Sequence, residues 1–199
     1  MELGVLTAAG LSLALGYALG SIPWGLLLTR FGGAGDLRTI GSGNIGATNV
    51  LRTGRKGLAA ATLALDAAKG AAAVLIASAM WPGLAVFAAT GAFFGHLYPV
   101  WLRFAGGKGV ATLLGVVVAL HWPSGLVYAA SWIATLAATR YSSLAGIVGG
   151  ISAPVSAALF GRFDLALLFL GLALMVVWKH RGNVERLLAG DEPQVGAKA

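Results

Sequence analysis

Apolar residues in this sequence occur in long runs that short polar segments interrupt. A membrane helix needs roughly 20 apolar residues to cross a hydrocarbon core of ~30 Å, and several of the runs approach or exceed this length. The predicted spans cover residues 3–29, 58–80, 84–102, 109–120, 126–139, 142–160 and 165–178. The pattern therefore predicts an all-α, polytopic membrane helix bundle that forms a single domain over residues 1–199.

Residues 109–139 allow two interpretations, because the turn 121–125, with its Pro123, interrupts an otherwise apolar run. The segment forms either one long span or two short helices that tilt or are shielded by neighbouring helices. Two helices bring the total to seven, and six or five spans remain alternatives. The choice changes which side of the membrane each later loop faces.

The distribution of cations favours the version with seven helices. With seven helices, Arg162 alone falls in a loop on the opposite side, whereas a single span over 109–139 moves Arg140 and the later cations across the membrane. Because cytoplasmic loops carry an excess of Lys and Arg, we expect the N-terminus outside and the C-terminus in the cytoplasm. The cations expected on the cytoplasmic side are Arg30, Arg38, Arg52, Arg55, Lys56, Arg103, Lys108, Arg140, Lys179, Arg181 and Arg186.

The composition supports a membrane protein and excludes other classes. Of the 199 residues, 58% are hydrophobic and only 11% are charged, whereas a soluble domain carries about 25% charged residues. A net charge of +7 would suggest nucleic acid in a soluble protein, but these cations lie in loops between spans, so we expect no nucleic-acid partner. Cysteine is absent, which excludes disulfides, a thiolate nucleophile and a cysteine metal site.

The polar run 41–52 is the strongest candidate site, because it interrupts a lipid-like sequence with glycines, neutral donors and one cation. Glycine permits positive φ without a steric penalty, and Arg52 supplies a forked cation suited to phosphate. The run therefore predicts a phosphate-recognition site at the membrane face. Its expected binding residues are Gly41, Ser42, Gly43, Asn44, Gly46, Thr48, Asn49 and Arg52.

A second polar cluster, Gly-Gly-Lys-Gly at residues 106–109, precedes an apolar helix on the same predicted face. Glycines before a helix leave backbone N–H groups free at a positive dipole end, which favours an anion, and Lys108 adds a mobile charge. We expect Gly107, Lys108 and Gly109 to contact phosphate. A flexible loop with a cytoplasmic lysine is the alternative reading, since the spacing is not that of a Walker A loop.

A third cluster follows the last predicted span. His180 and Asn183 are three residues apart and would share one face of a helix. A basic helix end that binds lipid headgroups is the alternative. His180 and Glu185 also form an imperfect version of the His-x4-Asp motif of acyltransferases with thioester donors, with Glu in place of Asp.

Two charged residues, Asp66 and Lys69, interrupt the second predicted span. A charge at mid-bilayer costs about 2.5–3.5 kcal/mol on insertion scales, so they form either a structural i,i+3 pair or part of a site. His96 is expected to make a hydrogen bond at the interface. Three scattered histidines and one intramembrane acid form no convincing metal set, and we expect neither a metal nor a soluble cofactor.

Taken together, these residues resemble the membrane-bound acyl-phosphate–glycerol-3-phosphate acyltransferase family of bacterial phospholipid synthesis. The first matching segment is a long, specific motif. Each of the other segments is less specific by itself, but they follow one another in the same order as in the family. They are residues 36–52, 65–70, 95–99, 106–112 and 180–192. The resemblance implies a seven-helix bundle in the bacterial inner (cytoplasmic) membrane, with the active site facing the cytoplasm.

The resemblance also implies a reaction. Family members transfer a fatty acyl group from acyl phosphate to the sn-1 hydroxyl of glycerol 3-phosphate, which gives lysophosphatidic acid and phosphate in the first acylation of phospholipid synthesis. It implies membrane lipid as surroundings, no cofactor, and a soluble acyl-phosphate-forming enzyme as a transient partner. Carried over by motif, the functional residues are Ser42, Arg52, Lys108, His180 and Asn183.

Two other functions fit the residues themselves. A small-anion transporter or channel also uses glycine breaks and helix ends that point at anions. An acyltransferase with a thioester donor would use His180 and Glu185 instead of the phosphate-binding clusters.

Overall fold

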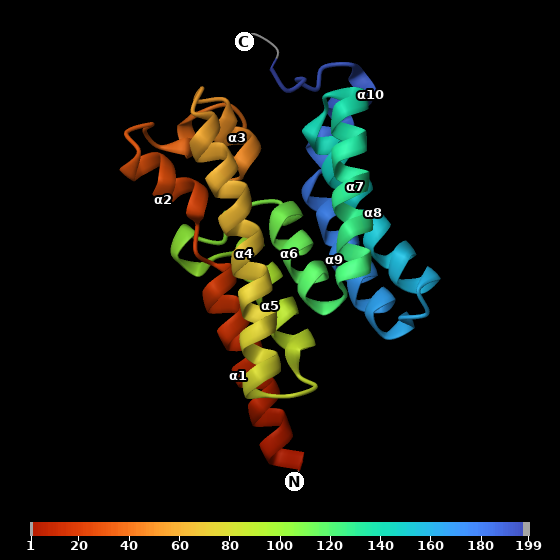
Figure 1. The fold of residues 1–199 in the computed structure, drawn as a ribbon. Coiled ribbons are helices and arrows are strands. Elements are labelled where there is room, and N and C mark those ends of the chain that lie inside the picture. The colour runs from red at the N-terminus through yellow and green to blue at the C-terminus, as the bar shows by residue number, and fades with distance from the viewer. Residues whose placement is uncertain (1, 197–199) are drawn as a thin grey trace. The chain divides into compact units, whose positions relative to one another are not determined.

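The computed structural model describes residues 2–196, and these residues form helices and loops without β-strands. The chain divides into two compact units, unit 1 up to Leu120 and unit 2 from His121 onward. The predicted all-α class is confirmed (Figure 1). That the two units act together as a single domain stays a prediction.

Unit 1 is built around the long helix α4. Its helices are α1 (Glu2–Gly20), α2 (Trp24–Phe31), η1 (Leu37–Thr39), α3 (Ala47–Leu51), α4 (Lys56–Met80), α5 (Ala85–Leu97), η2 (Val100–Leu102) and α6 (Val110–Leu120). Helix α5 packs against α1, and α4 packs against both α5 and α6. The short helices α2 and α3 pack against α4, and α3 is itself part of the polar run 41–52 (Figure 1).

Small residues allow the helices of unit 1 to approach closely. A Cβ atom at Gly16 would overlap the carbonyl oxygen of Ala88, and one at Gly20 would overlap that of Ala92. Membrane helices associate through such close backbone contacts, because lipid removes most of the hydrophobic driving force between them. The α1–α5 contact therefore depends on glycine at these two positions.

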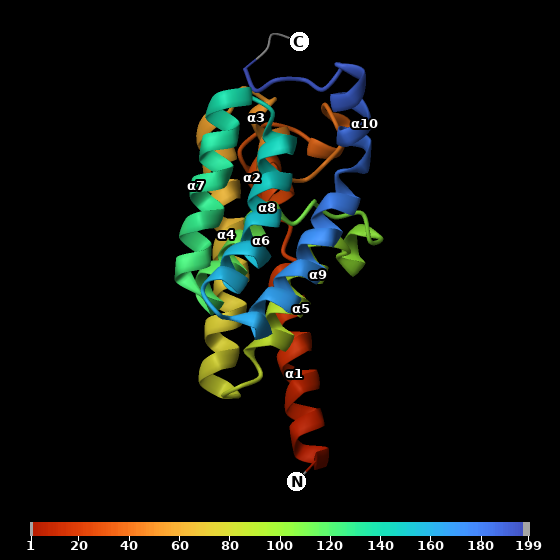
Figure 2. The same cartoon turned by 90° about the vertical axis from the view of Figure 1, so that its right-hand side faces the viewer.

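Unit 2 is a helical layer followed by a returning C-terminal segment. Its helices are α7 (Trp122–Thr139), α8 (Ser142–Leu159), α9 (Phe163–Lys179) and α10 (Arg181–Ala189). Helix α8 packs against both α7 and α9 (Figure 2). Gly190 adopts a φ of 80° and ends α10, and the chain then returns to the end of α7, where the Val195 N–H donates to the Arg140 carbonyl at 2.8 Å.

The structure settles the two interpretations of residues 109–139 in favour of two helices, because α6 ends at Leu120 and α7 begins at Trp122. The predicted span over residues 3–29 corresponds to the apolar segment Leu3–Phe31, but the helix in it is broken between α1 and α2, where Pro23 precedes the second helix. Proline has no N–H for the helical hydrogen bond and restricts the residue before it.

Four helical segments among the described residues are long and apolar enough to cross a membrane, and the bent pair α9–α10 raises this number to five. The four are Leu3–Phe31, Lys56–Met80, Ala85–Leu102 and Ser142–Leu159. Length and composition thus support a polytopic membrane protein. The crossing number of seven and the orientation of the termini stay predictions.

Candidate active site

The polar run 41–52, called the motif loop from here on, begins with backbone conformations that favour glycine. Gly41 and Gly43 have φ values of 54° and 67°, which residues with a side chain rarely adopt. Space is also restricted, since a Cβ atom at Gly41 would lie 2.6 Å from Asn49 Oδ1 and 2.7 Å from Arg52 Cδ. The start of the loop is therefore packed directly against Asn49 and Arg52.

Asn49 organises the motif loop from inside. Its side chain is almost fully buried, with 2% of the residue exposed. Its Oδ1 accepts from the Ser42 N–H at 3.3 Å and from Arg52 Nη1 at 3.5 Å. Its Nδ2 lies 2.8, 2.9 and 3.0 Å from the carbonyl oxygens of Asn44, Ile40 and Leu37. Both ends of the amide are used within the loop, so Asn49 stabilises the conformation of the loop, and its predicted contact with a ligand stays a prediction.

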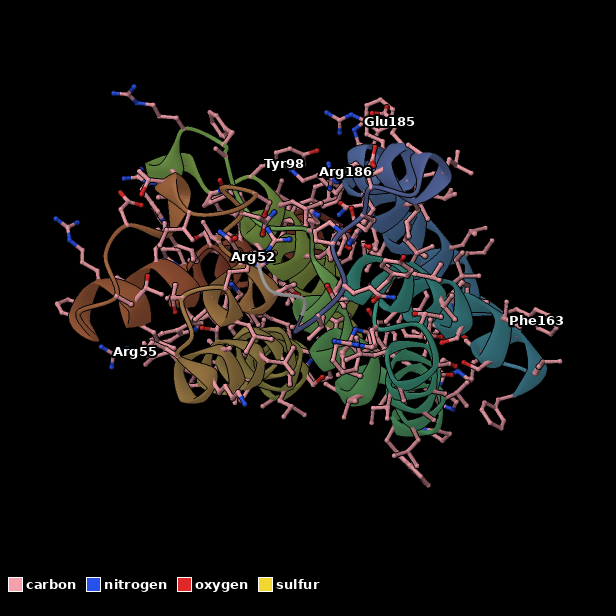
Figure 3. All side chains as sticks on the ribbon, turned by 90° about the horizontal axis from the view of Figure 1, so that it is seen from above. Arg52, Arg55, Tyr98, Phe163, Glu185 and Arg186 are labelled. Carbon is pink, nitrogen blue, oxygen red and sulfur yellow. The ribbon has the colours of Figure 1, made fainter. Side chains whose placement is uncertain are left out.

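The side chains that remain for a ligand lie on the exposed side of the loop. Ser42, Thr48 and Arg52 are exposed, whereas the Asn44 side chain accepts from the Gly46 N–H at 2.9 Å, just before α3 begins. Arg52 lies among the side chains of the loop, while Arg55 projects outward (Figure 3). Two hydroxyl groups and one guanidinium of the loop are thus exposed.

Residues 106–109, called the glycine loop, connect η2 to α6. The expectation that the N–H groups of its first two glycines are free is wrong, because Gly106 N donates to the Leu97 carbonyl at 3.2 Å and Gly107 N to the His96 carbonyl at 3.0 Å. These bonds attach the loop to the end of α5. Gly109 has a φ of 88°, and Lys108, partly exposed, remains the candidate phosphate contact of this loop.

The predicted pair within the second apolar span is confirmed. Lys69 Nζ lies 2.7 Å from Asp66 Oδ1, and both side chains are buried in α4. His96 is also buried, and its Nδ1 lies 2.9 Å from Lys69 Nζ. A charge in an apolar span is tolerated when it has a partner of this kind.

In unit 2, His180 occupies the junction between α9 and α10 and is 3% exposed. Its Nδ1 lies 2.8 Å from the Val176 carbonyl oxygen. Because a carbonyl only accepts, Nδ1 carries the proton of the neutral ring and Nε2 is the acceptor. The sequence predicts that His180 and Asn183 share one face of a helix. In the structure His180 precedes α10 and Asn183 lies in its first turn, where the Asn183 N–H donates to the His180 carbonyl at 2.8 Å.

Glu192 is a site residue that the residue-level reasoning missed. Its Oε1 accepts from Asn183 Nδ2 at 2.6 Å and its Oε2 accepts from Arg186 Nε at 2.8 Å. A carboxylate has no proton to donate, so this contact fixes which end of the Asn183 amide faces it. Nine residues separate the two side chains, and only the chain reversal after Gly190 brings them together. The matching segment 180–192 was the available signal.

The surroundings of Glu192 also change its acidity. Burial by itself raises the pKa of this carboxyl, but its neighbours Ser143, Asn183 and Arg186 lower the pKa below the ordinary value of 4.5. Glu185, the carboxylate of the His-x4-Glu pattern, is exposed on α10 (Figure 3). The carboxylate that organises this turn is therefore Glu192.

The candidate residues thus gather in two sets. Within unit 1 the structure joins Ser42, Asn49 and Arg52, and it attaches the glycine loop to α5; within unit 2 it joins His180, Asn183 and Glu192. Among residues 2–196, no group of three His, Asp or Glu side chains is placed to hold a metal ion. An apolar helical protein with cationic, glycine-rich loops has the features of a membrane enzyme for anionic substrates.

Comparisons with known proteins identify the family. A family model described as glycerol-3-phosphate acyltransferase matches residues 10–190. The glycerol-3-phosphate acyltransferase of Mesorhizobium japonicum is 57% identical over 188 residues, which cover 94% of this chain and 96% of that protein. That of Rhodopseudomonas palustris strain HaA2 is 55% identical over 199 residues, the full length of both. The chain belongs to the glycerol-3-phosphate acyltransferase family.

Solved structures agree with this assignment. The crystal structure of PlsY, an integral membrane glycerol 3-phosphate acyltransferase, in its glycerol 3-phosphate form has a TM-score of 0.89 and 36% identity, covering 94% of this chain and 96% of PlsY. The lysophosphatidic acid form has a TM-score of 0.87 and 34% identity, with 94% and 95% coverage. The family resemblance of the sequence is confirmed, and the fold is that of an integral membrane acyltransferase.

Proposed function

We propose that this protein transfers a fatty acyl group from acyl phosphate to the sn-1 hydroxyl of glycerol 3-phosphate, and so carries out the first acylation of phospholipid synthesis. The products are lysophosphatidic acid and inorganic phosphate, and the reaction takes place at the cytoplasmic face of a bacterial inner membrane. A soluble acyl-phosphate-forming enzyme supplies the donor. Family membership supports this proposal, as do the glycerol 3-phosphate and lysophosphatidic acid forms of the related PlsY structures.

The observation that carries the proposal is the position of the Arg52 guanidinium in the motif loop. Asn49 Oδ1 holds Arg52 Nη1 at 3.5 Å and the Ser42 N–H at 3.3 Å, so the guanidinium and the serine backbone have a common anchor. Within the described residues Arg52 forms no ion pair. An exposed guanidinium with such an anchor suits a phosphate, which it can bind with two parallel hydrogen bonds.

The phosphate charges of donor and acceptor require more than one cation. Each phosphate carries about −1.5 to −2 at neutral pH, by analogy with a phosphorylated side chain. Lys108 is the second cation that we assign to them. Arg38 pairs with Asp36, and Arg186 pairs with Glu192. We therefore assign neither of them to the phosphate charge that Arg52 and Lys108 leave unneutralised. Arg181, which lies 4.8 Å from the ring centroid of Trp178, is the better candidate.

The reaction needs little covalent help, because acyl phosphate is a mixed anhydride with a good leaving group. The acceptor hydroxyl oxygen bonds to the carbonyl carbon, and the bond from that carbon to the phosphate oxygen breaks. The hydroxyl proton passes to a phosphate oxygen of the donor, which leaves as inorganic phosphate. Lys108 stabilises the negative charge that develops in the transition state.

The polar pair of unit 2 suits hydroxyl groups. With its proton on Nδ1, His180 offers Nε2 as a hydrogen-bond acceptor. Asn183 has its amide nitrogen directed at Glu192, which makes its oxygen the acceptor on the other side. We therefore assign His180 and Asn183 to orienting glycerol hydroxyls and the two loops of unit 1 to binding phosphate.

The identity of the acyl donor is the part of the proposal that an assay tests most directly. Purified protein is incubated with glycerol 3-phosphate and either palmitoyl phosphate or palmitoyl-CoA, and lysophosphatidic acid and phosphate are quantified. We expect one phosphate released per lysophosphatidic acid with palmitoyl phosphate, and no product above background with palmitoyl-CoA. Product formation from palmitoyl-CoA at a similar rate contradicts the proposed donor. Positional analysis of the product tests the sn-1 assignment.

A further inference from the structure

Three ionisable side chains form a buried cluster inside unit 1 that the proposed reaction does not use. Asp66 and Lys69 lie on α4, and His96 lies near the end of α5. They are 3%, 5% and 4% exposed. Ionisable residues inside an apolar span are costly, and they occur mostly where they serve a polar pathway or a site.

Lys69 is the centre of this cluster. Its Nζ lies 2.7 Å from Asp66 Oδ1, 2.9 Å from His96 Nδ1 and 2.8 Å from the Ile22 carbonyl oxygen. An ammonium group only donates, so Nδ1 accepts in this contact, and the same Nδ1 lies 3.6 Å from Asp66 Oδ1. A neutral His96 then carries its proton on Nε2, on the other edge of the ring.

That other edge faces the glycine loop. A Cβ atom at Gly107 would overlap His96 Nε2 and would lie 2.7 Å from Cε1 and 3.0 Å from Cδ2 of the same ring. The Gly107 N–H also donates to the His96 carbonyl. The imidazole therefore supports the loop next to Lys108, and Gly107 is the residue that leaves space for it.

The third contact of Lys69 leads toward the motif loop. Ile22 lies at the break between α1 and α2, so its carbonyl is not committed to a continuous helix. Helix α2 then packs on the motif loop, because a Cβ atom at Gly25 would overlap the Ile45 carbonyl oxygen. One ammonium group is thus connected to both loops of unit 1, through His96 to one and through Ile22 and α2 to the other.

We propose that Asp66, Lys69 and His96 are positioning residues that hold the glycine loop and the motif loop in one fixed arrangement for phosphate recognition. This inference rests on the proposed function, in which both loops bind phosphate. Ligand groups must be held within fractions of an ångström, and the residues that support them set this precision. The competing view is a purely structural ion pair, which apolar or neutral residues can replace without loss of function.

A neutral double variant separates the two views. Lys69→Met alone removes the nearest cation from the buried Asp66 carboxylate and is expected to lower stability, whereas Asp66→Asn/Lys69→Met removes both charges. Thermal unfolding in detergent and steady-state kinetics are measured for both variants. We expect the double variant to recover the unfolding temperature of the unmodified protein and still to show an increase in the KM for glycerol 3-phosphate of about ten- to a hundredfold. Unchanged KM and kcat in a folded double variant overturn the proposal.

A second pair of substitutions tests the contact between the His96 ring and the glycine loop. These variants keep both Asp66 and Lys69. Gly107→Ala and His96→Ala are each expected to raise the KM for glycerol 3-phosphate. The added methyl group meets only the His96 ring among its nearest neighbours, so the double variant should be no worse than His96→Ala. Effects that multiply in the double variant overturn the proposed contact. His121→Ala, a histidine outside this cluster, is the matched control with unchanged kinetics.

Lys108→Gln distinguishes failure of this inference from failure of the proposed function. An unchanged KM and kcat in Lys108→Gln contradict the assigned role of the glycine loop itself. A raised KM in Lys108→Gln together with unaltered kinetics in the Asp66, Lys69 and His96 variants leaves the proposed function intact and overturns the positioning role alone.

Discussion

At the scale of single residues, Arg52 and Arg55 form a matched pair of exposed cations that follow one another closely in the chain. Arg52 is held in the motif loop by Asn49, whereas Arg55 projects outward (Figure 3). We predict that Arg52→Gln lowers kcat/KM for glycerol 3-phosphate acylation by about 10²-fold, because the substrate phosphate loses the bidentate contact that positions it. Arg55→Gln, measured in the same assay, should change it less than about twofold, because exposed charges are screened. Equal losses in the two variants refute the assignment.

A second prediction at this scale concerns Glu192, which connects Asn183 to Arg186. In Glu192→Gln, an amide nitrogen replaces one carboxylate oxygen. A hydrogen-bond donor then faces the N–H group of either Asn183 or Arg186, and that hydrogen bond is lost. We expect a lower unfolding temperature at pH 7 and a loss of acyltransferase activity, because the Asn183 amide is no longer held in one orientation. Glu185→Gln, an exposed position on the same helix, is the control and should behave like the unmodified protein.

The lowered pKa of Glu192 adds a pH dependence with a definite sign. Because the folded-state pKa lies below the ordinary 4.5, the carboxylate contributes stability that is fully present above pH 4.5 and is lost as the pH falls through the folded-state value. Unfolding temperatures measured between pH 7 and pH 3 should therefore fall less steeply for Glu192→Gln than for the unmodified protein. Parallel pH profiles would show that the carboxylate contributes nothing.

At the scale of elements, the contact between α1 and α5 yields a third prediction. Gly16→Ala places a methyl group into the Ala88 carbonyl, whereas Gly10→Ala on the same helix meets nothing within 4 Å. We expect Gly16→Ala to destabilise the protein by about 1–3 kcal/mol through overpacking. Gly10→Ala should be neutral or slightly stabilising, because alanine has the higher helix propensity. Thermal unfolding in detergent tests this, and indistinguishable variants contradict the close packing.

The elements also show where prediction from sequence succeeds. Each of the seven predicted apolar segments contains a helix in the structure, because the length of an apolar run is a local property. The start of α7 was the least accurate, and a proline is the reason. Pro123 was read as part of a turn but lies in the first turn of α7, where the missing N–H has no consequence. Pro23 separates α1 from α2, while Pro154 stays inside α8.

At the scale of the whole molecule, the predicted topology can be tested directly. The chain has no cysteine, so single cysteines at Ser42, Lys108 and Asn183 are unique labelling sites. We predict that a membrane-impermeant maleimide labels all three from the cytoplasmic side in oriented vesicles. Cysteines at Gly83 and Arg162, in loops of the opposite predicted side, are the control and should label from outside. Labelling of the three positions from different sides excludes a common cytoplasmic site.

The sequence by itself determined the all-helical membrane class, the family and the residue types able to bind phosphate, since these depend on composition, run length and short motifs. Tertiary structure alone decided the partners of Asn49, Lys69 and Glu192, and with them which polar groups remain for a ligand. It also showed that the Gly106 and Gly107 N–H groups are already used by α5. The physical reason is that these hydrogen bonds and ion pairs join residues that only folding brings together. The distance between two residues along the chain does not show whether their side chains are in contact.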